Sequence, residues 1–433
     1  MSEAVPTIVD DEPTMREDRM AMSLPRPPAI ADAPIVAPAL PAPDPILFSA
    51  VMALLGFGVV MVYSASAVYA NQKFGAATYF LRRDVAYAIL GVIAMTVAMR
   101  TDYSVWRRWA NPLLVASIGL LGAVLVVGSR INGARRWFHL GPLSFQPGEL
   151  AKLALVVYLA YSLAKKAEKI RSFTIGFVPH MIVCGLMMLL LLKQPNLGTA
   201  MILGLTTLML LFVAGAKMSY IVVAFLGAAP IVYQAIVGTP FRMRRMLAFI
   251  DPWQYRHDVG FQITESLISV GSGGIHGLGL GDSRQKLFFL PEAHTDYILA
   301  IIGEELGFIG IVTVALVFCV ILWRGVRAAL NARDAFGCYL AVGFTSMFGL
   351  QALVNIGVVL GAVPTTGLPL PFVSFGGSAL VIDLFAVGIL LDVSRGPEGR
   401  ARRTSLKVSA RPSLAGKNRK RPGGGRRVTV EVV

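Results

Sequence analysis

The sequence is organised around one polar segment, residues 238–297, whose middle reads Gly271-Ser272-Gly273-Gly274-Ile275-His276-Gly277-Leu278-Gly279-Leu280-Gly281 and whose end reads Pro291-Glu292-Ala293-His294-Thr295-Asp296. The apolar runs on either side, Met218–Val237 and Ile298–Leu322, are each long enough to cross a bilayer. Connections of this length inside a compact domain are uncommon and usually functional. We therefore expect a membrane protein whose candidate active site lies in this loop, at a membrane surface.

Composition agrees with a membrane protein. The 433 residues are 55% hydrophobic and only 15% charged, against about 25% charged in a soluble domain, and the mean hydropathy is +0.65. The pattern predicts an all-α, polytopic fold of about ten transmembrane helices. The predicted helices are Ile46–Val68, Val85–Met99, Pro112–Gly128, Glu149–Ala164, Thr174–Leu192, Gly198–Ala214, Met218–Val237, Ile298–Leu322, Gly337–Val359 and Ala379–Val393.

The two ends of the chain differ from this core. Residues 1–45 are rich in Pro and Ala without an apolar period, which predicts a disordered tail. Residues 46–393 form the membrane domain, and 394–433 carry a strongly basic tail. A basic tail can bind nucleic acid or acidic lipid, but a cytoplasmic juxtamembrane segment has the same composition. We favour the latter and expect no nucleic-acid partner.

Charge in the connections predicts the orientation. Alternate connections carry most of the Lys and Arg, so the positive-inside rule puts them and both termini in the cytoplasm, and puts residues 238–297 outside. Two outward connections break the rule, and their basic residues are Arg130, Arg135, Arg136, Arg242, Arg244 and Arg245. An anionic ligand on the outer side would explain this excess, since Arg binds phosphate through two parallel hydrogen bonds. Binding to lipid headgroups would explain it equally well.

Ionisable residues also occur inside the apolar runs. Glu149 and Lys152 are three apart on one helix face, where they can form an ion pair or shape a cavity. Glu304, Glu305 and Asp383 are candidates for a proton path, which would suit a transporter. The glycine-rich stretch lacks the Gly-Lys-Ser/Thr ending and the strand context of a nucleotide-binding loop. Its glycines instead predict either tight turns with close approach of the backbone to a ligand or an ordinary re-entrant structure.

The residue types in the loop favour one reaction. An aspartate such as Asp296 can remove a proton from an attacking hydroxyl, while nearby arginines stabilise a phosphate leaving group. ATP is absent outside the cytoplasm, so a glycosyl donor there is expected to be carried on a lipid pyrophosphate. A metal site made of Glu292, His294 and Asp296 is an alternative that the spacing supports only weakly.

Several ordered motifs match one family. They are Asn132-Gly133-Ala134-Arg135-Arg136-Trp137, Gln146-Pro147-Gly148-Glu149-Leu150-Ala151-Lys152, Gln194-Pro195-Asn196-Leu197-Gly198-Thr199, Gly277–Gly281 with Ser283 and Lys286, Leu290–Ile298, Gln351–Gly357 and Pro369–Ser378. From about Pro45 to Val393 the chain resembles the SEDS (shape, elongation, division, sporulation) proteins. It is most similar to their division-type branch, FtsW, and less similar to the elongation-type branch, RodA.

This resemblance implies a ten-helix inner-membrane peptidoglycan glycosyltransferase that polymerises lipid II at the division septum and releases undecaprenyl pyrophosphate. The essential loop aspartate of the family corresponds to Asp296. The implied partners are a class B penicillin-binding transpeptidase and other membrane proteins of the divisome. The family is described as working with a divalent cation, magnesium or manganese, although no sequence motif here requires one.

We therefore expect Asp296 to be catalytic and a larger set to bind substrate. The expected substrate-binding residues are Arg135, Arg136, Arg242, Arg244, Arg245, Glu149, Lys152, His294, Gln194, Lys286 and Ser374. Three positions depart from the family pattern: Asn196 replaces a frequent Asp, Thr366 stands where some members have Lys, and Gly148 replaces the Ser of a Gln-Pro-Ser-Glu pattern, which is a mild change. A lipid II translocator, an elongation-type polymerase and a septal scaffold remain alternative functions.

Overall fold

The computed structural model describes residues 42–131, 134–141, 143–286 and 290–396. Apart from 42–45 and 394–396, the predicted tails lie outside these residues. The helices are α1 Pro45–Phe74, α2 Tyr79–Arg100, α3 Ser104–Val127, α4 Pro147–Lys165, α5 Val178–Lys193, α6 Leu197–Val213, α7 Met218–Val237, α8 Pro240–Ile250, α9 Phe261–Gly273, α10 Ile298–Leu330, α11 Ala335–Val359 and α12 Ser378–Val393. The strands are β1 Ser129–Ile131, β2 Ala134–Leu140 and β3 Leu143–Phe145, and short 3₁₀ and π turns cover Ala167–Lys169 and Phe173–Phe177.

The predicted membrane helices are confirmed as helices. Each of the ten apolar runs falls on one of α1 to α7 or α10 to α12. In the part of the chain that the structure describes, six helices are long and apolar enough to cross a membrane by themselves. The other four predicted spans fall on α2, α6, α7 and α12; α6 and the Met218–Gln234 part of α7 are apolar but shorter. The chain is thus an all-α, polytopic membrane protein.

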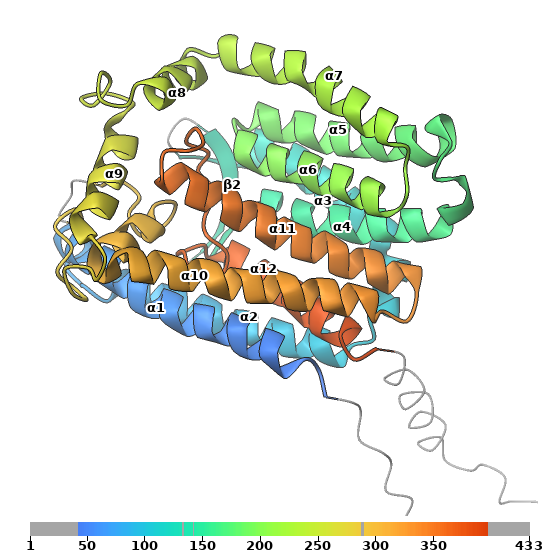
Figure 1. Cartoon of the computed structure of the whole chain (residues 1–433), viewed down its shortest axis with the longest axis horizontal. Helices are drawn as coiled ribbons and strands as arrows, with labels where there is room; N and C mark the ends of the chain where they lie inside the picture. Colours follow the sequence, from blue (N-terminus) through green and yellow to red (C-terminus); the bar gives the residue numbers. More distant parts are fainter. Residues whose placement is uncertain (1–41, 132–133, 142, 287–289, 397–433) are drawn as a thin grey trace, which may run out of the picture. The chain divides into compact units, whose positions relative to one another are not determined.

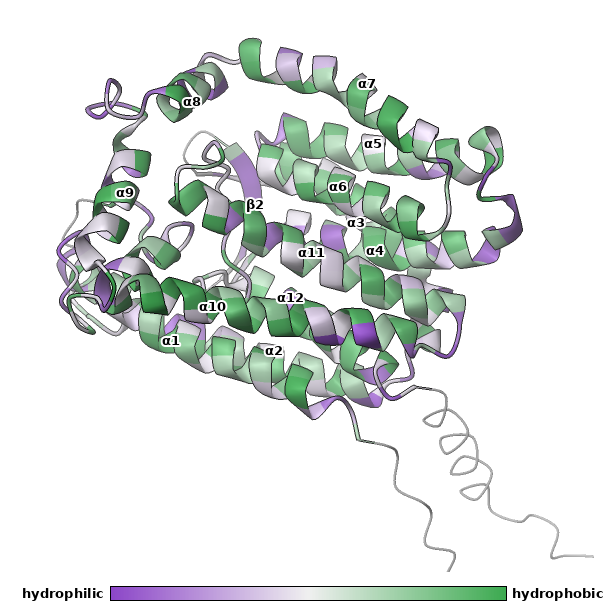
Figure 2. Cartoon of the chain, viewed as in Figure 1, coloured by the Kyte–Doolittle hydropathy of each residue, from purple (hydrophilic) through white to green (hydrophobic). Residues whose placement is uncertain are grey.

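The helices pack around a continuous apolar core. α2 lies along α12, α10 along α11, and α4 contacts both α3 and α11 (Figure 1). Phe336, Phe344 and Phe348 of α11 are fully buried in this core. Figure 2 shows apolar residues along most of the helices, with polar residues gathered in β2 and in the connections.

One helix, α7, stands apart from this packing. It contacts α8 and packs only lightly against α6, and none of its residues with a described burial is fully buried. Figure 1 shows α7 at the edge of the bundle, with α8 and α9 leading from its end toward the start of α10. α7 is therefore the membrane helix that packs most loosely against the described part of the bundle.

The connections at one end of the helices contain structure that the apolar pattern did not predict. The loop 238–297 contains α8 and α9, and the connection before α4 folds into an antiparallel sheet in the order β1-β2-β3. Arg130 pairs with Arg135 and Phe138 with Phe145 in this sheet. The two outward-predicted connections that broke the charge rule therefore lie at the same end of the bundle.

The connections at the other end are short and held by polar contacts. Tyr103 Oη donates to Asp334 at 3.1 Å, and Arg333 lies 3.6 Å from a carboxylate oxygen of Asp102. The backbone N–H of Tyr103 donates to Asp392 Oδ2 at 2.9 Å. Basic connections that the sequence placed on one side of the membrane thus meet at one end of the fold.

Candidate active site

Asp296 lies two residues before the start of α10, where two other segments hold it. Its backbone carbonyl accepts a 2.8 Å hydrogen bond from Asn355 Nδ2, and the same amide donates to the carbonyl of Leu368, also at 2.8 Å. Gly367 has φ +73°, and a Cβ atom on it would lie 3.3 Å from Asp296 Oδ2. The carboxylate therefore faces the loop at residue 367, where the backbone can pass close to it because glycine has no side chain.

Two cavities meet at Asp296. The smaller, of about 460 Å³, is lined by polar groups from several elements, among them Ser144, Gln146, Glu149 and Asn196. The larger, of about 840 Å³, extends between α6, α7 and α8 and is mostly apolar. The residues that line both are Arg136, Trp137, Glu292, Asp296 and Gly367. The carboxyl group of Asp296 and the guanidinium group of Arg136 thus lie where molecules bound in the two cavities could meet.

The adjacent arginines of β2 go to different places. Arg136 lines both cavities, and its Nε donates to the carbonyl of Gln194 at 2.9 Å while Nη2 donates to the carbonyl of Pro195. Arg135 Nη1 instead donates to the carbonyls of Leu125 and Val126 near the end of α3, at 3.1 and 2.9 Å. Neighbouring side chains of a strand point to opposite faces. Only Arg136 of this pair faces the site.

The arginines of α8 divide in the same way. Arg242 and Arg245 both line the larger cavity, and they donate to the carbonyls of Leu192 at 3.3 Å and Thr365 at 3.4 Å. Arg244 is exposed and pairs with Asp258 at 3.5 Å. Arg242 and Arg245 are three residues apart and share a helix face, and Arg244 lies outside that face. The structure thus brings three of the five predicted arginines to the cavities and places the other two elsewhere.

These charges set the protonation of Asp296. Burial and, to a smaller extent, the carboxylate of Glu292 raise the pKa of Asp296, the guanidinium groups of Arg245 and Arg136 lower it, and the net result is a pKa of about 7. Burial also lowers the pKa of Arg136 and of Arg245, and raises that of Tyr297. A carboxyl group that titrates near neutrality is suited to accept a proton during a reaction.

His294 lines the smaller cavity but does not join a metal site. Its ring lies 4.4 Å from that of Phe80 and 5.8 Å from that of Phe375, and burial lowers its pKa. No group of three or more His, Cys, Asp or Glu residues is arranged to hold a metal in the described ranges. The alternative of a Glu292–His294–Asp296 metal site is therefore wrong, because the imidazole is packed among aromatic rings.

A smaller set of ligands for a cation is nevertheless present. Glu292 and Asp296 both line both cavities. Magnesium keeps several waters and is usually held by one or two carboxylates together with substrate phosphates. Glu292 fits a cation that arrives with a phosphate group, whereas Asp296 is suited to accept the proton.

Glu149 and Lys152 form the ion pair that their spacing allows. Lys152 Nζ lies 2.7 Å from Glu149 Oε2 and donates to Gln351 Oε1 at 2.7 Å, and both charged side chains are buried. Gln351 Nε2 donates in turn to the carbonyl of Pro369. Glu149 and Pro369, at the two ends of this network, line the smaller cavity, whereas Lys152 and Gln351 line neither. The network therefore connects one cavity wall to the loop that packs against Asp296.

Asp383 belongs to this same group rather than to a path with Glu304 and Glu305. It interacts electrostatically with Lys152 and Glu149, whereas Glu304 and Glu305 bind residues of the loop 281–286. In the part of the chain that the structure describes, the acids proposed for a proton path thus fall into two separate clusters.

Three other expected site residues do not line either cavity. Gln194 Nε2 donates to the carbonyl of Leu121, and Ser374 Oγ accepts from the backbone N–H of Leu370. Lys286 pairs with Glu305 at 2.9 Å. Their contacts position the backbone around the site. Conversely, Trp137, Asn355 and Gly367 belong to the site; the sequence motifs include the first two, but predict no role for any of the three.

Comparison with known proteins agrees with this architecture. A chain named "Probable peptidoglycan glycosyltransferase FtsW" from Geobacter sulfurreducens is 48% identical over 353 residues, covering 81% of this chain and 95% of the relative. "Stage V sporulation protein E" of Bacillus subtilis is 45% identical over 356 residues, covering 82% and 97%.

Solved structures agree as well. A chain from a study titled "Structural coordination of polymerization and crosslinking by a peptidoglycan synthase complex" superposes with a TM-score of 0.68 at 31% identity, covering 83% of this chain and 98% of that one. The rod shape determining protein RodA of Thermus thermophilus superposes with a TM-score of 0.61 at 30% identity, covering 82% and 97%. The model of the cell cycle protein family FtsW/RodA/SpoVE matches residues 45–398. The chain belongs to this family.

Proposed function

We propose that this chain, a division-type peptidoglycan glycosyltransferase, polymerises lipid II at the junction of its two cavities with Asp296 as the general base. The observation that carries the proposal is that Asp296 lines both cavities, together with Arg136. A polymerase must hold a donor and an acceptor so that one reactive atom of each meets at the catalytic group.

The larger cavity suits the lipid-linked donor. Its walls include Met201 of α6 and Val232 and Ile236 of α7, which can accommodate a polyprenyl chain from the bilayer. Arg242 and Arg245 line the same cavity and can hold a diphosphate, as guanidinium groups bind phosphate oxygens in pairs. Loose packing of α7 against α6 is consistent with entry from the membrane.

The smaller cavity suits the sugar of the acceptor, because its lining offers hydroxyl, amide and carboxylate groups. In the reaction, the 4-hydroxyl oxygen of the acceptor sugar attacks the anomeric carbon of the donor with inversion, and its proton passes to Asp296. The bond between that carbon and the diphosphate breaks, and undecaprenyl pyrophosphate leaves. Arg136, Arg242 and Arg245 stabilise the negative charge that develops on the leaving group.

A divalent cation would be held by Glu292 together with the diphosphate. When bound there, it would neutralise charge on the leaving group. The protein is embedded in a membrane by several helices, and we place it in the bacterial inner membrane at the division septum, with both termini in the cytoplasm. Its proposed partners are a class B penicillin-binding transpeptidase and other divisome proteins. A relative of known structure comes from a study of a "peptidoglycan synthase complex", which supports such a pairing.

Reconstitution tests this function against the alternative of a lipid II carrier. Purified protein in vesicles is given labelled lipid II, and both glycan product and movement of lipid between leaflets are measured. We expect glycan strands that lengthen with time. Movement of lipid II without any glycan, in the presence and absence of a transpeptidase partner, would contradict the assignment.

A further inference from the structure

The helix α10 is interrupted at Gly307, about two and a half turns after its start. Gly307 has φ +67° and ψ −164°, so the backbone there is not helical and the helix divides into Ile298–Leu306 and a longer part that follows. A break of this kind leaves backbone groups without partners inside the helix. Unpaired backbone groups are costly in a membrane environment.

The glycine-rich loop fills this break. The N–H groups of Leu278 and Gly279 donate to the carbonyls of Glu304 and Glu305, at 2.9 and 3.0 Å. The N–H groups of Phe308 and Ile309 donate in turn to the carbonyls of Gly274 and Ile275. The loop thus takes the place of a missing helical turn.

Glycine is required for this close contact. A Cβ atom on Gly277 would lie 2.1 Å from the carbonyl oxygen of Glu305, and one on Gly307 would lie 2.4 Å from the backbone nitrogen of Gly277. The glycines thus bring the loop backbone close to α10, whereas the sequence predicted close approach to a ligand.

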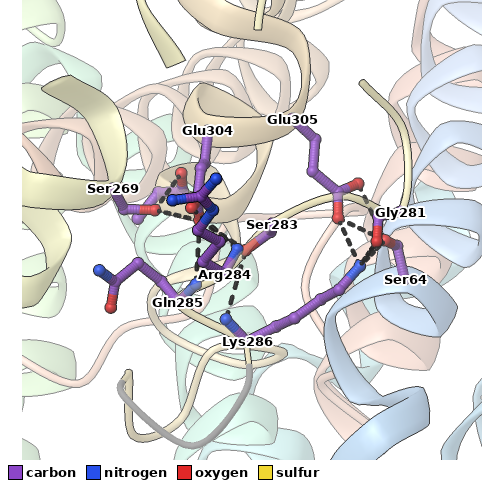
Figure 3. A network of polar contacts seen from close by, with 10 residues as sticks. Ser64, Ser269, Gly281, Ser283, Arg284, Gln285, Lys286, Glu304 and Glu305 are labelled. Carbon is purple, nitrogen blue, oxygen red and sulfur yellow. Dashed lines mark hydrogen bonds and ion pairs between the residues drawn. The ribbon is translucent and has the colours of Figure 1, made fainter. Parts of the chain in front are cut away.

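A side-chain network fastens the loop to the helix (Figure 3). The carboxylate of Glu304 accepts from Ser283 Oγ at 2.5 Å, from Ser269 Oγ at 3.1 Å and from the backbone N–H of Arg284 at 2.9 Å. Glu305 pairs with Lys286 at 2.9 Å and accepts from Ser64 of α1 at 2.7 Å. Both carboxylates are buried. Hydrogen bonds and an ion pair therefore stabilise both negative charges, and the loop supplies Ser283 and Lys286 among the partners.

This network lies outside the two cavities, but it shares a rigid helix with the segment that carries Asp296. None of Ser283, Lys286, Glu304 and Glu305 lines either cavity at Asp296. Yet the short helix begins two residues after Asp296 and ends just beyond Glu305, and all its residues from Ile298 to Glu305 are buried. Its far end can therefore set the place of its near end, roughly 12 Å away at 1.5 Å per residue.

We propose that Ser283, Lys286, Glu304 and Glu305 are positioning residues, which lock the short helix Ile298–Leu306 against the glycine loop and so hold Asp296 beside Arg136 and Arg245. This inference rests on the proposed function. Catalysis is sensitive to such placement, because an error of about 1 Å can cost about a hundredfold in rate.

A double-mutant cycle on Lys286 and Glu305 tests the proposal. Lys286→Met and Glu305→Gln each leave a buried charge without its partner, whereas the double variant leaves none. We expect each single variant to lower kcat for lipid II about tenfold or more with KM within about twofold, and the double variant to recover most of the loss. Ser283→Ala should lower kcat as well, and Ser283→Thr, which keeps the hydroxyl, should restore it.

The pH profile distinguishes positioning from simple destabilisation. Asp296 faces Arg136 of β2, Arg245 of α8, and Glu292 and Tyr297 of its own segment. If the short helix shifts, these distances change and the acid limb of kcat/KM moves in the single variants.

A matched control is the ion pair of Asp44 and Arg324. It joins Asp44, which caps the start of α1, to the opposite end of α10, at 2.5 Å with side chains 7% and 12% exposed. Asp44→Asn and Arg324→Met should lower thermal stability and leave the acid limb in place. Lys286 and Glu305 variants that behave like this control, with unchanged kcat per folded protein, would overturn the proposal. Absence of polymerisation by the wild-type protein would instead overturn the proposed function.

Discussion

The carboxyl group of Asp296 lies among charges of both signs. Burial and Glu292 favour its neutral form, whereas Arg245 and Arg136 favour its charged form. A base must be deprotonated to act, so activity should be present above its pKa and lost below it. Small changes in the surrounding charges should therefore appear directly in the pH dependence of the reaction.

We expect kcat/KM for lipid II to fall as the pH is lowered through about 7, the pKa of Asp296. Glu292→Gln removes a charge that raises this pKa, so the acid limb should move to lower pH. Arg245→Gln removes a charge that lowers it, so the limb should move to higher pH. Initial rates of glycan formation between pH 5 and 9 measure both shifts, and a shift of either variant in the opposite direction would contradict the electrostatic assignment.

Gly367→Ala should impair the reaction through backbone strain and crowding. The residue has φ +73° and would place Cβ 3.3 Å from Asp296 Oδ2. An alanine in this conformation costs about 1–3 kcal/mol, and it also pushes on the carboxylate. Gly361→Ala is the control, because its φ of +68° is similar but its Cβ would meet only Leu267. Both variants should lose stability, but only Gly367→Ala should lower kcat. Equal kcat values would contradict an effect of the Gly367–Asp296 contact on the reaction.

The choice among the arginines follows from local periodicity that the sequence contains. Once residues 134–140 are known to be a strand, Arg135 and Arg136 must face opposite ways. Once residues 240–250 are known to be a helix, Arg242 and Arg245 share a face that excludes Arg244. The charge pattern alone does not distinguish the five arginines, because the apolar pattern predicts neither this strand nor this helix. That Arg136 and Arg245 meet at one aspartate depends on tertiary packing, which no local pattern encodes.

At the scale of elements, long apolar runs were informative and short amphipathic ones were not. The ten runs gave ten helices because about twenty consecutive apolar residues have few alternatives in a membrane. By contrast, α8 is 11 residues long and α9 is 13, and isolated helices of that length are marginal without tertiary contacts. The break in α10 was also missed, because Gly307 stands inside an unbroken apolar run.

The buried pair in α4 should stabilise the fold only as a pair. Lys152→Met leaves the carboxylate of Glu149 buried beside an apolar side chain, and such a loss costs about 3–5 kcal/mol. The double variant Glu149→Gln/Lys152→Met should be more stable than the single one. Thermal unfolding in detergent measures the order. As a control, Arg107 pairs with Asp334 at an exposed position, where Arg107→Gln should cost about 1 kcal/mol or less. A double variant less stable than Lys152→Met would contradict the claim that Glu149 and Lys152 stabilise the fold only as a pair.

At the scale of the whole molecule, the connections separate into two groups. One end carries the sheet, α8, α9 and the cavities, while the other carries the short connections around Tyr103, Asp334 and Asp392. This separation agrees with the alternation from which the sequence predicted an inside and an outside. The proposed donor, a lipid diphosphate carried in the outer leaflet, requires the first end to face outward.

A topology reporter tests this requirement. Asp258 lies in an exposed turn between α8 and α9, so an insertion there should be tolerated. Alkaline phosphatase inserted after Asp258 should be active, and a fluorescent protein that folds only in the cytoplasm should be dark. The same pair placed after Ala167, in the basic connection after α4, serves as the control and should give the reverse result. A bright cytoplasmic reporter at residue 258 would contradict the proposed orientation.

The central claim is that Asp296 is the base for glycosyl transfer, and the Asp296→Asn variant tests it most directly. The amide keeps the shape of the carboxyl group but cannot accept the proton, and general base catalysis is worth about 10²–10⁴ in rate. With purified protein and labelled lipid II, in the presence and absence of its transpeptidase partner, we predict that the variant folds and binds lipid II but forms glycan at least a hundredfold more slowly. Polymerisation at the wild-type rate would contradict the account.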